Sequence, residues 1–510
     1  MNKQEIKEYA NKGRERLGSR KWIILLFLLS IFLGTVGITE IGEVTNLYSY
    51  KHILVLFSIF CGGTLCILFY SDRKHLHNLV CIIVLVFGLM NSIVTPILDS
   101  PDEPIHFRRA ELTSRGDFFP KIINEQGYMT IRSVIDIENE HGKSLSSAKK
   151  ENINYDQAQV THVADSNFFL GYIPQAIGIL VAKILHLSEI WMVLLGRIMN
   201  VLLAAVIARY AVKIVRGFKI PIMAVCCMPM ALYQASSLSI DCTINYFSIL
   251  TVAYFIKLYE AGEKSISRWQ ICCFLLLCFV AGISKITYMA LACLIILLPK
   301  KNFRYSKDYK YIFIAILGMG AIAVLWYIYT LNLPKIVNEQ NSYLVQNNVN
   351  ITGQVVFIMN NFIQVLHMLL RELFANGQQI FNGFFTFGWL SYGAPLLAYL
   401  YSLFYGSILL LYPNTVIFNK KVRIGIVGIC VLIFIATEII MYLTWTGVGS
   451  LSVAGVQSRY YLPLLVLLPM ATNFNLTIAK NGKNLELYYV TGMVFFVSFM
   501  IITTMVHYYS

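Results

Sequence analysis

The chain has 510 residues, of which 57% are hydrophobic and only 13% are charged, and its formal net charge is +14. So large an apolar share excludes a soluble globular domain and predicts a protein that crosses a membrane many times. All eleven cysteines lie in or at the edge of apolar runs, so they indicate neither a disulfide framework nor a thiolate metal site.

Apolar runs of about 20 residues, the length that a helix needs to cross a bilayer, recur along the chain. They lack the alternating pattern of barrel strands, so we expect helices. The predicted fold class is therefore all-α, a polytopic integral membrane protein with about 13 transmembrane helices and interfacial helices in its outer loops. The basic N-terminus resembles the start of a signal peptide. No small-residue cleavage site with a soluble domain follows, so we expect the first span to be retained.

Six regions follow from this pattern. They are a basic cytoplasmic N-terminus (1–21), three N-terminal transmembrane helices (22–98), a first large extracytoplasmic loop with an acidic motif and interfacial helices (99–189), a group of transmembrane helices (190–330), a second extracytoplasmic loop (331–388) and the C-terminal transmembrane helices (389–510). The two apolar segments between 270 and 299 are short for spans.

Positive charge is distributed unevenly between the two predicted sides of the membrane. With the N-terminus inside, the inner segments hold 26 of the 41 Lys and Arg residues and eight acids, a balance of +18, whereas the rest of the chain has a balance of −4. Positive residues gather on the cytoplasmic side of membrane proteins. The net charge therefore indicates orientation in a lipid bilayer and no nucleic-acid partner.

One apolar stretch, 171–187, is long enough to cross the membrane, but a crossing there would put the next cluster of Arg and Lys outside. We expect instead a short helix at the outer surface, broken by Pro174 and with Lys183 at the membrane interface.

The densest polar cluster of the chain, 99–109, directly follows the third apolar run. Ser100 is a favourable N-cap, Pro101 suits the first helical position, and Glu103 stands three residues after the serine, which predicts a capping box. A helix starting there would place Asp102 or Glu103 on one face with His106.

Only one of the two adjacent acids, Glu103, has an obvious structural role at the start of a helix. Glu103 closes the expected capping box, and acids in a first turn complement the helix dipole, so it has a structural reading as well as a functional one. Asp102 is not needed for the cap, which favours a functional role. His106 could orient a carboxylate or be a satisfied interfacial histidine.

Four more ionisable residues lie at or near the outer ends of predicted spans: Asp241, Lys285, Arg459 and, about a third of the way into its span, Arg197. Ionisable groups near membrane depth are costly and are candidates for function. For the cations, snorkelling to lipid headgroups is the alternative.

Several motifs together carry a family resemblance. They are Pro101-Asp102-Glu103-Pro104 with His106, Tyr172-Ile173-Pro174-Gln175, Gly196-Arg197 with Asn200, Met228-Pro229-Met230 with Gln234, Ser236, Ser237 and Asp241, Lys285-Ile286-Thr287-Tyr288, and Ser458-Arg459-Tyr460-Tyr461-Leu462-Pro463. In this order, from about residue 99 to about residue 470, the set resembles a bacterial membrane-protein family of unknown function that is similar to the GT-C glycosyltransferases.

The resemblance implies a GT-C-like helical fold in the bacterial cytoplasmic membrane, with an active site on the outer side. Enzymes of this kind move a sugar from a polyprenyl-phosphate donor to an acceptor outside the cytoplasm, with inversion. A motif aspartate acts as base. That position matches Asp102, with Glu103 as the competing choice. This chain departs from the pattern in placing two spans ahead of the span that leads into the motif.

Such a transfer needs a base for the acceptor hydroxyl and cations for the departing phosphate. We expect Asp102 as base, with His106 orienting it or sharing the phosphate. Arg459 is the first expected phosphate ligand because guanidinium binds phosphate bidentately, followed by Lys285 and Arg197. The expected substrate-binding residues are Asp241, Tyr172, Gln234 and Tyr460. Since these cations can neutralise the phosphate, we expect neither a metal nor a cofactor.

Other interpretations stay open. A cell-surface polysaccharide polymerase or ligase would share the spans and outer loops, but with its main arginine-rich loop later in the chain. A membrane transporter would place ionisable groups near the midplane, where Glu438 is the one acid well inside a span. Amide side chains in the second outer loop could bind a cell-envelope glycan acceptor or be merely solvated: Asn338, Gln340, Asn341, Gln346, Asn347, Asn348 and Asn350.

Overall fold

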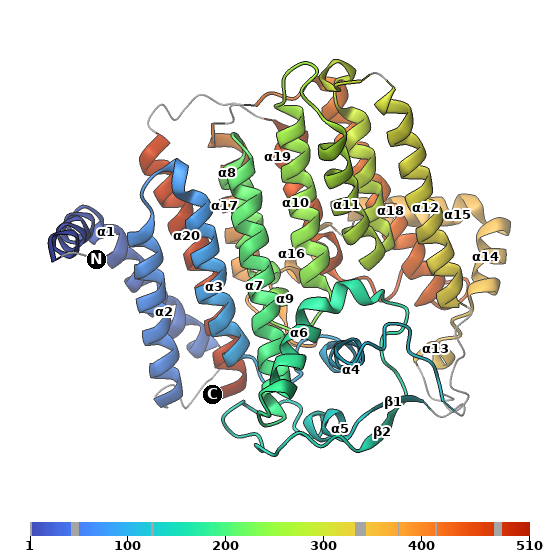
Figure 1. Ribbon diagram of the computed structural model, residues 1–510, viewed down its shortest axis with the longest axis horizontal. Coiled ribbons are helices and arrows are strands. Elements are labelled where there is room, and N and C mark those ends of the chain that lie inside the picture. Colours follow the sequence, from blue (N-terminus) through green and yellow to red (C-terminus); the bar gives the residue numbers. More distant parts are fainter. Residues whose placement is uncertain are drawn as a thin grey trace.

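A computed structural model describes residues 3–41, 50–123, 127–305, 307–331, 343–375, 377–413, 416–473 and 482–509. Helices dominate these residues, as the sequence predicts, and the strands form two small two-stranded sheets. Most of the helices stand side by side, and the segment 99–189 gathers at one end of them, at the bottom of Figure 1. Of the amide residues in the second outer loop, Asn338, Gln340 and Asn341 lie outside the described residues.

The N-terminal part and the first outer segment run as follows. The elements are α1 (Lys3–Ile41), α2 (Tyr50–Phe69), the 3-10 helix η1 (Arg73–His75), α3 (Leu76–Val94), α4 (Glu103–Ser114), β1 (Tyr128–Ile131), α5 (Arg132–Glu138), β2 (Gln157–Val160), the 3-10 helix η2 (Phe169–Tyr172) and α6 (Ile173–Ile184). Strands β1 and β2 pair antiparallel, with Tyr128 opposite Val160.

The remaining elements follow in chain order. They are α7 (Ile190–Ile214), α8 (Lys219–Cys226), α9 (Pro229–Ala235), α10 (Asp241–Tyr259), α11 (Arg268–Ser284), the 3-10 helices η3 (Ile286–Leu297) and η4 (Lys300–Asn302), α12 (Asp308–Leu331), α13 (Tyr343–Gln346), α14 (Ile351–Asn360), α15 (Phe362–Ala375), α16 (Gly377–Gly383), β3 (Thr386–Phe387), β4 (Tyr392–Gly393), α17 (Pro395–Leu411), α18 (Lys420–Thr444), the 3-10 helix η5 (Ser458–Leu467), α19 (Leu468–Thr472) and α20 (Gly482–Tyr509). Strands β3 and β4 pair antiparallel.

Among the described residues, eight helices are long and apolar enough to cross a membrane, or nine if α14 and α15, bent by 102° at their junction, count as one span. The expectation of about 13 full-length spans is therefore supported only in part. The other five expected spans correspond to shorter or broken elements: α8 with α9, α11, η3, α17, and η5 with α19. A 3-10 helix rises about 2.0 Å per residue against about 1.5 Å in an α-helix, so η3 covers more of the bilayer than its length suggests.

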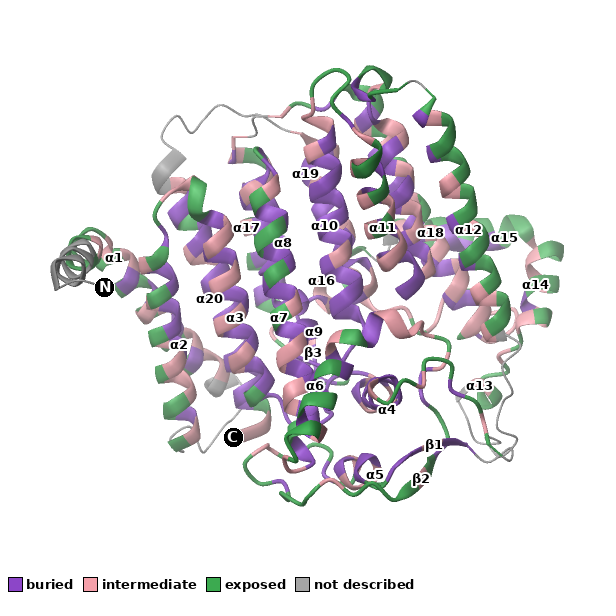
Figure 2. Ribbon diagram, viewed as in Figure 1, coloured by how far each residue is buried: buried purple, intermediate pink, exposed green. Residues whose placement is uncertain are grey.

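Burial separates central from peripheral helices. Most of α10 and α20 is buried among neighbouring helices, whereas most of α12 is exposed at the flank (Figure 2). The first residue of α10, Asp241, is one of the residues expected to bind substrate, so a well-packed part of the fold carries a candidate site residue.

The stretch 171–187 contains a short helix, α6, as the sequence predicts, and no helix of full spanning length. Pro174 lies at the N-terminal end of α6 and does not break it, since a first helical turn has no bond for the missing N–H to lose. The Lys183 ammonium is 2.8 Å from the Glu111 carboxylate and 2.9 Å from the Ser114 hydroxyl, with a side chain only 10% exposed. Lys183 thus joins α6 to α4, and its expected place at a membrane interface stays a prediction.

The end of the helices opposite the segment 99–189 is basic. The Arg20 guanidinium donates to the Ile67 carbonyl (2.7 Å), and Arg73 lies 3.8 Å from the Glu486 carboxylate. At the other end, the Tyr509 hydroxyl donates to the Val94 carbonyl (2.8 Å), so α20 finishes beside the end of α3. The chain therefore has one basic end and one end that carries the acidic motif.

Candidate functional site

The acidic motif lies in the turn that enters α4. The helix begins at Glu103, and Asp102 is its N-cap with a left-handed backbone (φ 63°) and no side-chain cap bond. The expected capping box is therefore wrong in register: Ser100 lies before the cap, and Pro101 is outside the helix. Only half of the expected pair forms, as the Ser100 N–H donates to the Glu103 carboxylate (3.2 Å). Aspartate is one of the few residues that tolerate a left-handed backbone.

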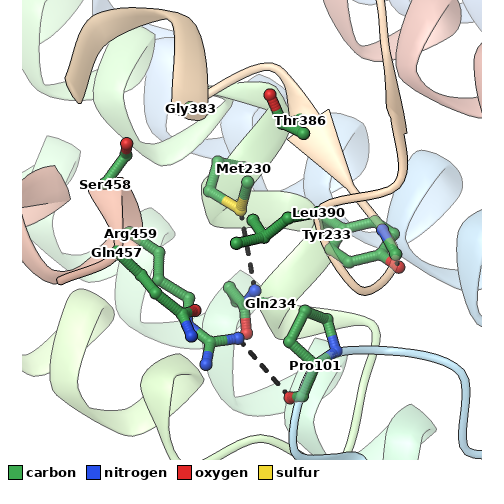
Figure 3. Close-up of a pocket in the computed structure, with 11 residues that line it drawn as sticks. Pro101, Met230, Tyr233, Gln234, Gly383, Thr386, Leu390, Gln457, Ser458 and Arg459 are labelled. Atoms are coloured by element: carbon green, nitrogen blue, oxygen red, sulfur yellow. Dashed lines mark hydrogen bonds between the residues drawn. The ribbon is translucent and has the colours of Figure 1, made fainter. Parts of the chain in front are cut away.

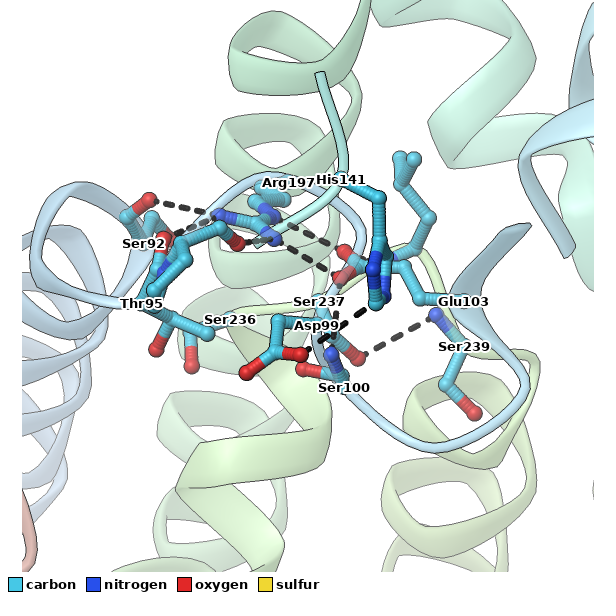
Figure 4. A network of polar contacts seen from close by, with 12 residues as sticks. Ser92, Thr95, Asp99, Ser100, Glu103, His141, Arg197, Ser236, Ser237 and Ser239 are labelled. Atoms are coloured by element: carbon cyan, nitrogen blue, oxygen red, sulfur yellow. Dashed lines mark hydrogen bonds and ion pairs between the residues drawn. The ribbon is translucent and has the colours of Figure 1, made fainter. Parts of the chain in front are cut away.

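Glu103 and Arg197 form a fully buried ion pair between α4 and α7 (Figure 4). The guanidinium donates two bonds to the carboxylate, at 2.8 and 2.7 Å. Its remaining N–H groups donate to carbonyl oxygens at the end of α3, those of Ser92 (3.1 Å), Thr95 (2.8 Å) and Pro96 (2.7 Å). Glu103 also accepts the Leu238 N–H at 3.0 Å. All five guanidinium N–H groups are thus used within the protein.

These contacts change the interpretation of both residues. Arg197 has no N–H left for a donor phosphate and no exposed surface, which argues against the phosphate-binding role expected from sequence. Glu103 accepts four bonds and is equally buried, so it cannot receive a proton from an acceptor without losing them. The pair instead fixes the turn that carries Asp102 to the ends of α3 and α7.

Asp102 points away from this pair, toward η5 and α10. Its carboxylate lies 2.6 Å from the Arg459 guanidinium, and its side chain is 38% exposed. Arg459 also lies 3.1 Å from the Asp241 carboxylate through Nε, and donates to the Pro101 carbonyl at 3.4 Å. Arg459 is almost fully buried and so bridges two carboxylates that are far apart in the sequence. The motif turn, α10 and η5 meet at this bridge.

Lys285 adds a second cation to this group. It lies between α11 and η3, and its ammonium stands 3.1 Å from the centre of the Tyr460 ring. The Tyr288 hydroxyl donates to the Tyr460 carbonyl (2.5 Å), which holds η3 against η5. Burial lowers the pKa of Lys285 to about 7, although the Asp241 charge opposes the shift. We refer to Asp102, Asp241, Lys285 and Arg459 as the charged centre.

His106 lies one turn into α4 and contacts Tyr172 of η2. The Tyr172 hydroxyl is 2.6 Å from His106 Nδ1 and accepts a bond from the Asn167 amide at 3.0 Å. A hydroxyl that already accepts one bond can donate its proton to Nδ1, which suits a neutral imidazole protonated at Nε2. Burial also lowers the pKa of His106, against the raising influence of the Asp102 and Asp241 charges. Tyr172 therefore holds the His106 imidazole in place beside the charged centre.

A narrow pocket opens on the other side of Arg459, lined partly by Pro101, Tyr233, Gln234 and Gln457 (Figure 3). Gln234 is 1% exposed, and its amide donates only to the Met230 sulfur (3.6 Å). The amide oxygens of Gln234 and Gln457 are both buried without a hydrogen-bond partner. Unpaired buried acceptors are rare, and two of them beside one pocket suit a ligand hydroxyl or an ordered water.

The structure thus brings together most of the residues expected from sequence. Asp102, Asp241, Lys285, Arg459 and Tyr460 meet directly. His106 with Tyr172 and the Gln234 pocket flank them, whereas Glu103 and Arg197 form a separate network. Sequence reasoning did not assign roles to Asn167, Gln457 or Tyr288, although the last two lie within or directly beside the quoted motifs.

Among the described residues, no three His, Cys, Asp or Glu side chains gather as metal ligands. The expectation of a metal-independent site stays a prediction that a chelator can test. The eleven cysteines are all free thiols in the structure.

Comparison with known proteins identifies the family but no activity. A family of predicted membrane proteins, DUF2142, matches residues 85–468, a span that contains every residue of the charged centre. No curated protein and no solved structure matches the chain. Because the match covers most of the chain, this membrane protein belongs to the DUF2142 family.

Proposed function

We propose that this protein is a glycosyltransferase of the bacterial cytoplasmic membrane. In this proposal it moves a sugar from a polyprenyl-phosphate donor to a cell-envelope glycan on the outer side, with inversion and a GT-C-like arrangement. The observation that carries the proposal is the charged centre, in which two carboxylates and two cations meet at one end of a helical membrane protein.

Asp102 is the proposed base. It is the most accessible carboxylate of the centre and has one free oxygen, since only Oδ2 contacts Arg459. It would take the proton from an acceptor hydroxyl while that oxygen attacks the anomeric carbon of the donor. The bond between the anomeric carbon and the phosphate oxygen breaks, and the phosphate leaves with the electron pair.

Lys285 and Arg459 are the proposed ligands of the departing phosphate. We place Lys285 first, reversing the order expected from sequence, because Arg459 is already held by Asp102 and Asp241. The Lys285 ammonium faces the Tyr460 ring, a weaker partner that a phosphate can replace. Arg459 then serves both to position Asp102 and to stabilise negative charge as it develops on the phosphate.

The flanking groups suit sugar recognition. The unpaired oxygens of Gln234 and Gln457 can accept bonds from hydroxyl groups, and Tyr172 with His106 offers a second polar surface. Orientation in the membrane follows from charge: the basic end of the helices would face the cytoplasm and the charged centre the outside.

The test is complementation of a deletion strain followed by analysis of its cell-envelope glycans. We expect the wild type to restore a missing sugar and Asp102→Asn to restore at least about 100-fold less, the scale of a lost general base. The matched control is Asp136→Asn, which removes a partly exposed carboxylate paired with Arg132 on the same outer segment. Full restoration by Asp102→Asn at wild-type abundance would overturn the proposal, as would a glycan profile that the deletion leaves unchanged.

A further inference from the structure

An open aromatic groove lies beside the charged centre, between the outer segment and the flank of the helices. Its walls include Phe119 and Phe168 from the outer segment, Ile283 from α11, and Ile322 and Trp326 from α12. The Trp326 ring is 4.9 Å from Phe168 and 6.2 Å from Phe119, measured between ring centres. Almost every lining side chain is apolar, so the groove does not suit a sugar or a soluble substrate.

Hydrogen bonds to backbone carbonyls hold the aromatic loops in place. The Trp326 indole N–H donates to the Ser166 carbonyl at 3.2 Å. The buried Arg109 donates to the Phe118 carbonyl (2.8 Å) and to the Asn167 carbonyl (3.4 Å), one residue away from each of the two lining phenylalanines. The groove is therefore fixed by the same α4 that carries His106.

The groove borders a helix that is apolar and largely exposed. Ile322 is 49% exposed on α12, a helix long and apolar enough to cross the membrane and exposed along most of its length. In Figure 1, α11 and α12 stand at the flank, with the loops of the outer segment below them. On a flank that faces lipid, such a groove favours an apolar chain over water, because contact between water and its apolar walls is unfavourable.

One lining residue of the groove lies close along the chain to the charged centre. Ile283 precedes Lys285 by two residues, so their Cα atoms are at most about 7 Å apart. On the other wall, Asn167, the neighbour of Phe168, donates to the Tyr172 hydroxyl that contacts His106. An amphipathic molecule with a phosphate at Lys285 would thus have its apolar chain at the groove.

We propose that this groove holds the first isoprene units of a lipid-linked phosphate whose headgroup lies at Lys285 and Arg459. The inference rests on the proposed function, since it deepens the identity of the donor. Branched isoprene units fill the gaps between aromatic rings, and the two cations complement the phosphate. Two cations close to one wall of the groove would favour a single chain with an anionic head over the bulk lipid of the bilayer.

Photolabelling tests the groove without any sugar transfer. A polyprenyl phosphate carrying a photoreactive group on its first isoprene units is added to membranes that contain the full-length protein, and labelled peptides are mapped. We expect label on α12 near Trp326 and on α11 near Ile283. Excess unlabelled polyprenyl phosphate should reduce it at least five-fold, and the same amount of phosphatidylglycerol should not.

Two variants and a control separate the groove from general lipid contact. Trp326→Ala widens the groove and Ile322→Trp fills it, and each should lower labelling at least five-fold. Trp269→Ala is the control, because Trp269 is 76% exposed near the start of α11, away from the groove. Equal competition by phosphatidylglycerol, or equal labelling of both groove variants and the wild type, would mean that ordinary bilayer lipid occupies the groove and would overturn the inference. A labelled groove together with an active Asp102→Asn would instead overturn only the proposed chemistry.

Discussion

Arg197→Met gives the sharpest test of how the acidic motif is held. Methionine has an unbranched side chain of similar length but no N–H groups. The substitution therefore removes all five hydrogen bonds that Arg197 donates to Glu103 and to the carbonyls at the end of α3. It leaves the Glu103 carboxylate fully buried with only two backbone N–H partners. Removing one partner of a buried ion pair costs about 3–5 kcal/mol, so we expect a loss of that size in the free energy of unfolding.

The protein is purified in detergent micelles and unfolded by titration with a denaturing detergent. The free energy of unfolding is measured for each variant. Arg132→Met is the control, because the Arg132–Asp136 pair (3.2 Å) is half-exposed and such pairs contribute at most about 1 kcal/mol. Arg197→Lys should recover only part of the loss, since an ammonium cannot make five bonds in a plane. An Arg197→Met protein as stable as the Arg132→Met protein would refute the structural role, and the phosphate-binding role of Arg197 would have to be reconsidered.

Three further predictions concern the charged centre and its flanks. Sugar transfer should decline as the pH rises through about 7, because Lys285 loses its charge there, and Lys285→Arg should abolish this alkaline decline in a pH–rate profile; identical profiles would contradict the role of Lys285. Burial lowers the pKa of His106, so at acidic pH the unfolded chain binds a proton at this residue more readily than the folded protein does, and stability should fall as the pH drops below about 6.5. In thermal unfolding, His106→Asn should reduce this loss of stability at acidic pH. An unchanged loss would contradict the prediction. Gln234→Leu should leave unfolding unchanged within about 1 kcal/mol, since its amide oxygen has no partner to lose, but lower transfer at least about ten-fold; undiminished transfer would exclude the pocket from substrate binding.

The helical class and the site both follow from sequence signals that are local. Asp102 and Arg459 could be selected individually because charged groups at the ends of apolar runs are costly, and the structure places them 2.6 Å apart. The length of each run was a poorer guide. η3 and η5 are 3-10 helices, which have no distinctive pattern in an all-apolar segment, so the sequence could not distinguish these elements from full-length α-helical spans.

What the sequence could not supply was the partner of each ion. Glu103 and Asp102 are adjacent acids, and nothing in their composition tells which will meet Arg197 and which Arg459. The left-handed turn at Asp102 decides this by sending the two side chains to different neighbours. The sequence signal for the aromatic groove was weak: two Phe-Phe pairs in a polar segment, at Phe118-Phe119 and Phe168-Phe169.

The left-handed turn also sets what a substitution at position 102 can reveal. Only Gly, Asn and Asp adopt that backbone at little cost, whereas most other side chains pay about 1–2 kcal/mol there. If position 102 were changed to every other residue, protein abundance would therefore depend on how easily each residue adopts the left-handed backbone, with Gly and Asn near the wild type. The rate of sugar transfer would depend only on whether the residue has a carboxylate. A failed Asp102→Ala or Asp102→Glu protein would confound the two, and Asn is the variant that isolates the chemistry.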